Sequence, residues 1–97
     1  MLSVPRDEIA ALCRRWRVTE FSLFGSAVRK DFGPDSDVDV LVRFEAEAGW
    51  SLFDLVTMQE ELERLFGRPV HLVEAEGLRN PFRRDEILRT REVVYAS

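Results

Sequence analysis

The sequence predicts a small α/β (α+β) domain in which helices pack on a mixed β-sheet. Helix-type and strand-type patterns alternate along the 97 residues. The longest helical pattern separates the second strand from the third, as a right-handed crossover between parallel strands requires. An apolar content of 45% and a charged content of 33% fit a soluble globular protein. A chain of this length is expected to form one domain over residues 1–97.

The first helix is predicted over residues 5–17, and Pro5 fits its first turn. Cys13 is the only cysteine, so the chain can form neither an intramolecular disulfide nor a Cys-based zinc cluster. Its place among apolar residues predicts a buried, inert thiol, and Trp16 is expected in the core. The apolar positions follow the i, i+3, i+4, i+7 spacing of a buried stripe: Ile9, Leu12, Cys13 and Trp16.

Two strands joined by a short helix and a turn follow. Residues 19–24 are rich in aromatic and β-favouring side chains and predict a strand that ends at Gly25. Ser26 occupies the N-cap position of a short helix directly after it, and residues 33–36 have the Gly-Pro-Asp-Ser composition of a turn. Residues 37–44 predict a second strand with two faces: Val38, Val40 and Val42 on one, and Asp37, Asp39 and Leu41 on the other.

The longest helix is predicted over residues 52–66. Ser51 is its N-cap, Asp54 completes a partial capping box, and Gly67 is its C-terminal stop. Six residues are predicted to form its inward-facing stripe: Leu52, Leu55, Val56, Gln59, Leu62 and Phe66.

Shorter elements complete the chain. Residues 70–73 predict a third strand, and residues 82–90 predict an Arg-rich helix after the break at Asn80-Pro81. Residues 92–96 fit either an edge strand or the frayed end of that helix, and the sequence leaves this choice open.

The turn after the first strand has the features of an anion-binding site. Gly25 has no side chain, so the backbone can approach a ligand closely. The backbone N–H groups that follow open a helix, and such unpaired donors attract phosphate oxygens. Ser26 adds a hydroxyl donor, and Arg29 lies nearly one turn later. Capped turns of this kind are common, so this pattern alone is weak.

Asp37 and Asp39 are two residues apart on the second strand, so both carboxylates leave one face with their Cα atoms roughly 6 to 7 Å apart. Two carboxylates at this separation can converge on a hard cation such as Mg²⁺. Two like charges side by side cost free energy unless a cation is intended. The pair therefore predicts a metal site that neutralises nucleotide phosphates and polarises the phosphorus under attack.

Chain geometry brings these two features together. About eleven residues separate Ser26 from Asp37, so the first two strands are expected to be antiparallel, with the anion site beside the carboxylates. The third strand returns after the long helix and is expected to run parallel to the second. Val70 and His71 are then level with the segment Asp37-Val38-Asp39.

These residues resemble a family signature. Gly25-Ser26-x-x-Arg29, followed by Ser36-Asp37-x-Asp39-x-Leu41-Val42, is similar to the motif of the DNA polymerase beta-like nucleotidyltransferases. The small size and the helices on either side of the motif resemble the minimal nucleotidyltransferase (MNT) group. The resemblance covers nearly the whole chain, and the combined motif is specific.

The resemblance implies a polymerase beta palm-like core that transfers a nucleoside monophosphate to a hydroxyl group on a partner protein. AMP from ATP is the expected nucleotidyl group. The resemblance also implies that Asp37 and Asp39 bind Mg²⁺, with Mn²⁺ as an alternative. It further implies that the phosphates of ATP or another nucleoside triphosphate lie near Gly25, Ser26 and Arg29, and we add Ser36 to this set. Such proteins are often antitoxins paired with a HEPN-domain toxin, and some members transfer AMP onto a tyrosine of that toxin.

His71 departs from the family pattern, which usually has a third carboxylate on the third strand. Glu74 is a poor substitute because it falls on the opposite face of a regular strand. His71 could act as a general base on the acceptor hydroxyl, or it could ligate a softer metal such as Mn²⁺ or Zn²⁺. In the third interpretation it is a polar strand residue in a site that binds nucleotide but turns over poorly.

Three functional hypotheses follow: a transferase with catalytic Asp37, Asp39 and His71; a binding module that neutralises its partner by forming a complex; and a structural domain with solvated acids.

The net charge of −4 and the pI near 5.0 argue against broad nucleic-acid binding. Neither a signal peptide nor a membrane span is recognisable, so no membrane partner is expected and the cytoplasm is the predicted location.

Overall fold

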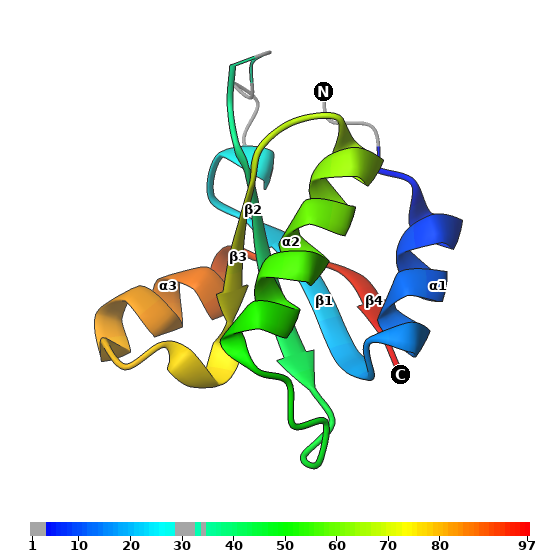
Figure 1. Ribbon diagram of the computed structural model, residues 1–97. Helices are drawn as coiled ribbons and strands as arrows, with labels where there is room; N and C mark the ends of the chain where they lie inside the picture. The colour runs from blue at the N-terminus through cyan, green and yellow to red at the C-terminus, as the bar shows by residue number, and fades with distance from the viewer. Residues whose placement is uncertain (1–3, 29–32, 34) are drawn as a thin grey trace.

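The computed structural model describes residues 4–28, 33 and 35–97, which form one four-stranded sheet flanked by helices (Figure 1). The strand order is β3-β2-β1-β4. This arrangement confirms the predicted α/β class with a mixed sheet. The strands are β1 (Val18–Phe24), β2 (Val38–Phe44), β3 (Val70–Glu74) and β4 (Glu92–Ala96); the helices are α1 (Arg6–Arg15), α2 (Leu52–Phe66) and α3 (Pro81–Thr90), with 3₁₀ turns η1 (Gly25–Val28) and η2 (Ala75–Gly77).

Strand pairing follows the predicted topology. β1 and β2 are antiparallel, and β2 and β3 are parallel, with α2 as the crossover between them. β4 pairs antiparallel with β1. This pairing answers the question left open at residues 92–96, because hydrogen bonds to the exposed edge of β1 make this segment a strand.

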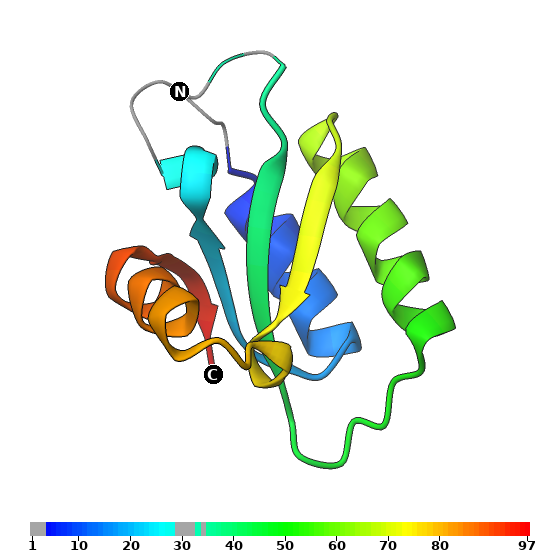
Figure 2. The ribbon, with the colours of Figure 1, turned by 90° about the vertical axis from the view of Figure 1, so that its left-hand side faces the viewer.

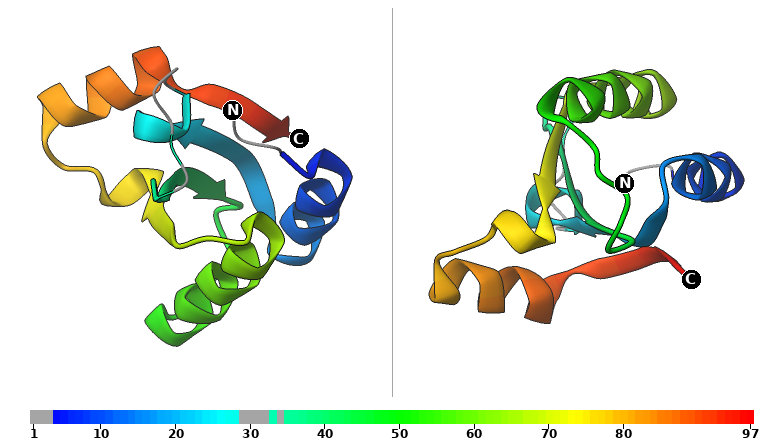
Figure 3. Two further views of the ribbon diagram at one scale, coloured as in Figure 1. Left: turned by 90° about the horizontal axis from the view of Figure 1, so that it is seen from above. Right: turned by 60° about the horizontal axis from the view of Figure 1, so that its bottom comes forward.

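The helices lie on opposite faces of the sheet. α1 and α2 cover one face, and α3 lies against the other (Figures 2 and 3). The larger core cluster, beneath α1 and α2, includes Ile9, Leu12, Cys13, Phe21, Val38, Val40, Val42, Met58 and Leu62. The smaller cluster beneath α3 consists of Phe24, Leu41, Ala75 and Ile87. None of the helices in the described part of the chain is long and apolar enough to cross a membrane.

The ends of α2 agree with the sequence prediction. The Ser51 hydroxyl accepts a hydrogen bond from the Asp54 backbone N–H, and the Asp54 carboxylate accepts one from the Ser51 N–H, which forms a capping box. Gly67 ends the helix with a φ of 70°, a left-handed conformation that glycine adopts without strain.

The predicted inward stripe of α2 is wrong in part. Leu62 is buried, but Leu52 is 80% exposed and Val56 is 55% exposed. Met58, which the prediction left out, is fully buried. Apolar residues occupy two neighbouring stripes of this helix, and the sheet covers only the stripe that contains Met58 and Leu62.

The first helix is shorter than predicted. Pro5 is its N-cap rather than a first-turn residue, and the helix ends at Arg15. Arg17 has a φ of 58°, which turns the chain into β1. Trp16 is buried, as predicted, and packs edge-on against Trp50. Cys13 is fully buried as well, and burial raises the pKa of its thiol to about 12, against a smaller lowering by Arg14.

Candidate functional site

Asp39 lies at the centre of the candidate site. It is the second residue of β2, and its Cα partners are Phe24 on β1 and His71 on β3. Because side chains alternate along a strand, its carboxylate points to the α3 face while Val38 and Val40 are buried under α1 and α2. The Asp39 side chain is 23% exposed, so it is accessible to a ligand.

Gly25 packs directly against the Asp39 carboxylate. Its φ is 61°, which side-chain-bearing residues rarely adopt, and a Cβ at this position would overlap Asp39 Oδ2 and lie 3.3 Å from Asp39 Cγ. Two independent constraints therefore require glycine here. The group that approaches the Gly25 backbone within the chain is a carboxylate of the candidate site, and the approach of a ligand to Gly25 stays a prediction.

Ser26 does not act as the predicted N-cap. The 3₁₀ turn η1 begins at Gly25, so Ser26 lies inside it, and its hydroxyl donates a hydrogen bond to the Asp37 carbonyl oxygen over 3.2 Å. This bond ties the turn after β1 to the residue before β2. The Ser26 hydroxyl proton is therefore already hydrogen-bonded to the Asp37 carbonyl oxygen, whereas the Ser26 hydroxyl oxygen keeps lone pairs that can accept a further hydrogen bond. Arg29 lies outside the described residues.

The loop before β2 is held by contacts that the sequence did not reveal. Ser36 N–H donates to the Gly33 carbonyl, and the Ser36 hydroxyl accepts from the Gly33 N–H, each over 3.1 Å. Arg68 Nη1 donates to the carbonyl oxygens of Gly33 and Ser36 at 3.0 and 3.3 Å. The α2–β3 connection thus fixes the loop that leads into the exposed Asp37. No motif signals this role of Arg68, because it depends on which loop lies within reach of the connection.

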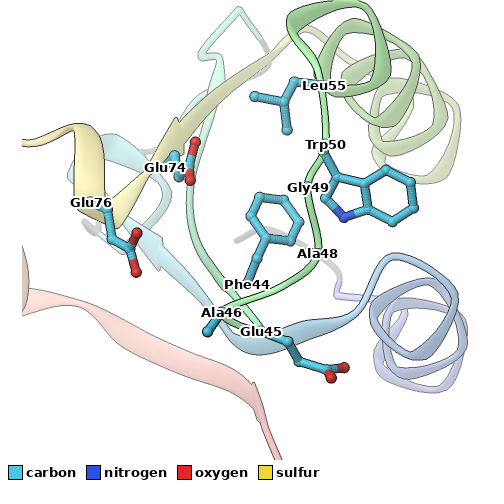
Figure 4. Close-up of a pocket in the computed structure, with 9 residues that line it drawn as sticks. All are labelled: Phe44, Glu45, Ala46, Ala48, Gly49, Trp50, Leu55, Glu74 and Glu76. Atoms are coloured by element: carbon cyan, nitrogen blue, oxygen red, sulfur yellow. The ribbon is translucent and has the colours of Figure 1, made fainter.

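His71 is in register with Asp39, as predicted. Its Nδ1 lies 3.4 Å from Asp39 Oδ1, and its side chain is 57% exposed. The structure therefore puts an imidazole beside the Asp39 carboxylate, at the position where the sequence resemblance implied a third acid. Glu74 pairs with Val42 at the other end of β3. There it lines a different hollow, which agrees with its predicted exclusion from the site (Figure 4).

The donor set fits a divalent cation bound mainly through carboxylate oxygens. Within the described residues, Asp39 has no ion-pair partner apart from His71, and no three His, Cys, Asp or Glu side chains are grouped as a complete metal cage. Mg²⁺ is typically bound by one or two carboxylates, with substrate phosphates and water completing its coordination. Asp39, fixed against Gly25, and the neighbouring Asp37 match that incomplete set.

Sequence comparison decides the family. The model of the nucleotidyltransferase domain matches residues 8–94, which include both strands of the candidate site. The chain belongs to the nucleotidyltransferase domain family. Its fold agrees: a solved structure assigned as a minimal nucleotidyltransferase superimposes with a TM-score of 0.75 at 36% sequence identity, over 90% of this chain and 86% of that one.

Two further similarities are to a protein adenylyltransferase and to a chain in a toxin–antitoxin complex. The protein adenylyltransferase MntA of Thermococcus cleftensis is 40% identical over 84 residues, which is 87% of this chain and 80% of the relative. The fold is also shared with a chain in the structure of a tri-AMPylated Shewanella oneidensis HEPN toxin in complex with MNT antitoxin. That match has a TM-score of 0.69 at 16% identity and covers 95% of this chain and 70% of the other.

Proposed function

We propose that this nucleotidyltransferase transfers AMP from ATP to a hydroxyl group on a partner protein, as the antitoxin of a HEPN toxin. The observation that supports this most directly is the packing of Gly25 against Asp39, with His71 Nδ1 3.4 Å from the same carboxylate. The protein adenylyltransferase MntA, 40% identical to this chain, supports the reaction type. The AMPylated toxin complex, which shares the fold, supports the kind of partner.

In this proposal Asp37 and Asp39 hold the divalent ion, and Gly25, Ser26, Arg29 and Ser36 surround the phosphates. A bound Mg²⁺ or Mn²⁺ ion would supply neutralisation of the phosphate charge and polarisation of the α-phosphorus. The hydrogen bond from the Ser26 hydroxyl to the Asp37 carbonyl oxygen supports this arrangement, because it joins the turn after β1 to the residue before β2. Arg68 positions Ser36 and Asp37 through the loop carbonyls.

His71 is proposed to take the proton from the acceptor. His71 Nδ1 lies 3.4 Å from Asp39 Oδ1. A neutral imidazole that carries its proton on Nδ1 has a free lone pair on Nε2, as a general base requires. The hydroxyl oxygen forms a bond to the α-phosphorus, the bond between this phosphorus and the pyrophosphate oxygen breaks, and the hydroxyl proton moves to His71 Nε2. The exposed imidazole can then release that proton to water.

In this proposal the partner protein presents the acceptor hydroxyl. An apolar surface is available for contact with it. Leu52, Phe53 and Val56 are all more than half exposed at the start of α2, and a groove beside them is lined by Val42, Leu55 and Leu72. Exposed apolar groups of this kind commonly mark protein interaction sites.

The test is AMP transfer measured by intact mass of a co-purified HEPN-domain partner incubated with ATP and Mg²⁺. Asp39→Asn is expected to lower the transfer rate by about 10³-fold or more, because it removes a charged metal ligand. The fold should be kept, since the side chain lies on the open face. Asp35→Asn, the same chemical change on an exposed loop residue, is the matched control. Transfer retained by Asp39→Asn would contradict the metal assignment.

The alternative function is a binding module that neutralises its partner by complex formation, and the replacement of the third carboxylate by His71 favours it. Under that alternative, Asp37→Asn and Asp39→Asn still form and protect the complex. His71→Asp separates the two functions. It raises Mg²⁺-dependent transfer if the histidine has weakened a family-type site, and lowers transfer if His71 is a working base.

A further inference from the structure

We infer that the pocket between η1 and α3 holds the nucleoside end of the nucleotide, with Arg83 and Glu86 as its polar contacts. This inference rests on the proposed function, because it extends the same site. The pocket has a volume of about 320 Å³, at the lower end of the range for small-molecule sites. Its walls come from the end of β1, from η1 and from one face of α3: Phe24, Gly25, Val28, Arg83, Glu86, Ile87 and Thr90.

Gly25 joins this pocket to the candidate metal site. One side of its backbone packs against the Asp39 carboxylate, and the same residue lines the pocket. A nucleotide whose α-phosphate lies at Asp39 therefore has an adjoining hollow for its remaining part. A side chain at this position would fill the space between the two.

The inner wall of the pocket suits a planar base. Phe24 and Ile87 are 5% exposed and belong to the core cluster under α3, and Val28 adds a third apolar side chain from η1. Ligand pockets combine such apolar walls with a few polar groups that fix orientation. Phosphate oxygens gain nothing from apolar walls, so the wall favours the nucleoside over the triphosphate tail.

The rim supplies those polar groups. Arg83, Glu86 and Thr90 recur at three- and four-residue spacing, so they lie on one face of α3 together with Ile87. Among the described residues, neither the Arg83 side chain nor the Glu86 carboxylate has a hydrogen-bond or ion-pair partner. A carboxylate accepts hydrogen bonds from ribose hydroxyls, and a guanidinium donates to base acceptors or stacks on a ring. Glu86 would repel phosphates, which again favours the nucleoside.

Two other pockets are poorly placed to bind the nucleoside. The pocket near Trp50, Glu74 and Glu76 lies beside Phe44, at the far end of β2 from Asp39 (Figure 4). Phe44 is five positions further along the strand than Asp39, a distance of roughly 17 Å. The groove lined by Leu12, Glu61 and Leu65 belongs to α1 and α2, on the opposite face of the sheet from the carboxylate. The pocket at η1, by contrast, shares Gly25 with the Asp39 contact.

The experiment measures binding directly, by calorimetric titration of the whole chain with Mn²⁺·ATP and, separately, with Mn²⁺·tripolyphosphate. Arg83→Glu is compared with Arg84→Glu, an equal change of charge on the next residue of α3, which does not line the pocket. ATP affinity is expected to fall about tenfold in Arg83→Glu and less than about twofold in Arg84→Glu. Tripolyphosphate affinity should be the same in the two variants.

Glu86→Ala gives a sharper test, because a carboxylate that contacts the ribose and a carboxylate that only faces phosphates predict opposite changes in ATP affinity. Removing a negative charge strengthens the binding of an anion if the carboxylate only faces phosphates, whereas loss of a ribose contact weakens ATP binding, here by about fivefold. Asp85→Ala is the matched control. The inference is overturned if ATP binding is unchanged or tighter in Glu86→Ala than in this control, or if Arg83→Glu weakens tripolyphosphate as much as ATP. A wild-type chain that binds no Mn²⁺·ATP overturns the proposed function itself.

Discussion

The two faces of the sheet are built from the same strands but differ in almost every physical property. On β2, Val38, Val40 and Val42 are fully buried under α1 and α2, whereas Asp39 faces α3 and is partly exposed. On β3, Val70 belongs to the buried face and His71 to the open one. Because successive side chains of a strand point to opposite faces, one segment supplies both the buried core that stabilises the fold and the exposed residues of the candidate site.

The open face is only partly covered. α3 buries the small cluster around Phe24, Leu41 and Ile87 and leaves Asp37 and Asp39 accessible. Substitutions on the α1–α2 face should therefore change the free energy of unfolding with little effect on nucleotide affinity. Substitutions at the open end should do the reverse. Leu62→Ala and Gly25→Ala test this division, with the larger expected loss of stability first, and Cys13→Ala tests whether the α1–α2 face shields its buried thiol from solvent.

Leu62→Ala should lower the free energy of unfolding by about 3 kcal/mol, because it leaves a cavity in the larger core. Urea denaturation followed by far-ultraviolet circular dichroism measures the change. Leu52→Ala, the same substitution on the same helix at a side chain that is 80% exposed, should cost less than about 0.5 kcal/mol. Similar losses in the two variants would show that the sheet covers the other stripe of α2.

Gly25→Ala should affect both properties, because Gly25 lies where core and site meet. The positive φ costs about 1 to 2 kcal/mol for alanine, and the added Cβ must displace the Asp39 carboxylate. Mn²⁺ affinity should fall with stability. Gly77→Ala is the control, since a Cβ there meets nothing within 4 Å and the φ of Gly77 is not positive. Unchanged Mn²⁺ affinity in Gly25→Ala would contradict the proposal that Asp39 binds the metal ion.

Cys13 should make stability fall in alkaline solution. Its thiol has a pKa of about 12 in the folded chain against an ordinary value of 9.0, so above pH 9 the unfolded chain loses the proton first. The stabilisation that comes from keeping the Cys13 thiol neutral is present below pH 9 and is lost between pH 9 and 12. Over this range the free energy of unfolding falls with a slope approaching about 1.4 kcal/mol per pH unit. Urea titrations at pH 8 and 10 should show a smaller decline in Cys13→Ala. Equal declines would indicate that the thiol is not shielded.

Much of the fold could be predicted because local signals agreed with the tertiary structure. The Ser51–Asp54 capping box and Gly67 marked the ends of α2 within one residue. The crossover through this helix fixed the parallel register that brings His71 beside Asp39. These features depend on short-range chemistry or on chain connectivity, both of which are visible in a sequence.

The errors concern choices that depend on distant parts of the chain. Periodicity showed that α2 is apolar but could not show that Met58, rather than Leu52 and Val56, meets the sheet. Ser26 has the chemistry of an N-cap, yet its hydroxyl bonds to the Asp37 carbonyl because β2 returns beside the turn. Arg68 was missed as a support of the loop at Ser36, since only the folded chain brings them together.

The contact between Trp16 and Trp50 has a practical consequence for spectroscopy. The two rings are 4.8 Å apart between centroids, and Trp50 Nε1 donates to the Trp16 carbonyl over 2.7 Å. They are the only two tryptophans in the chain, and both lie on the side of α1 and the loop before α2. Intrinsic fluorescence therefore reports the packing of that side as a single coupled chromophore. Events at Asp39 should leave the emission unchanged, so they need a label or a probe on the ligand.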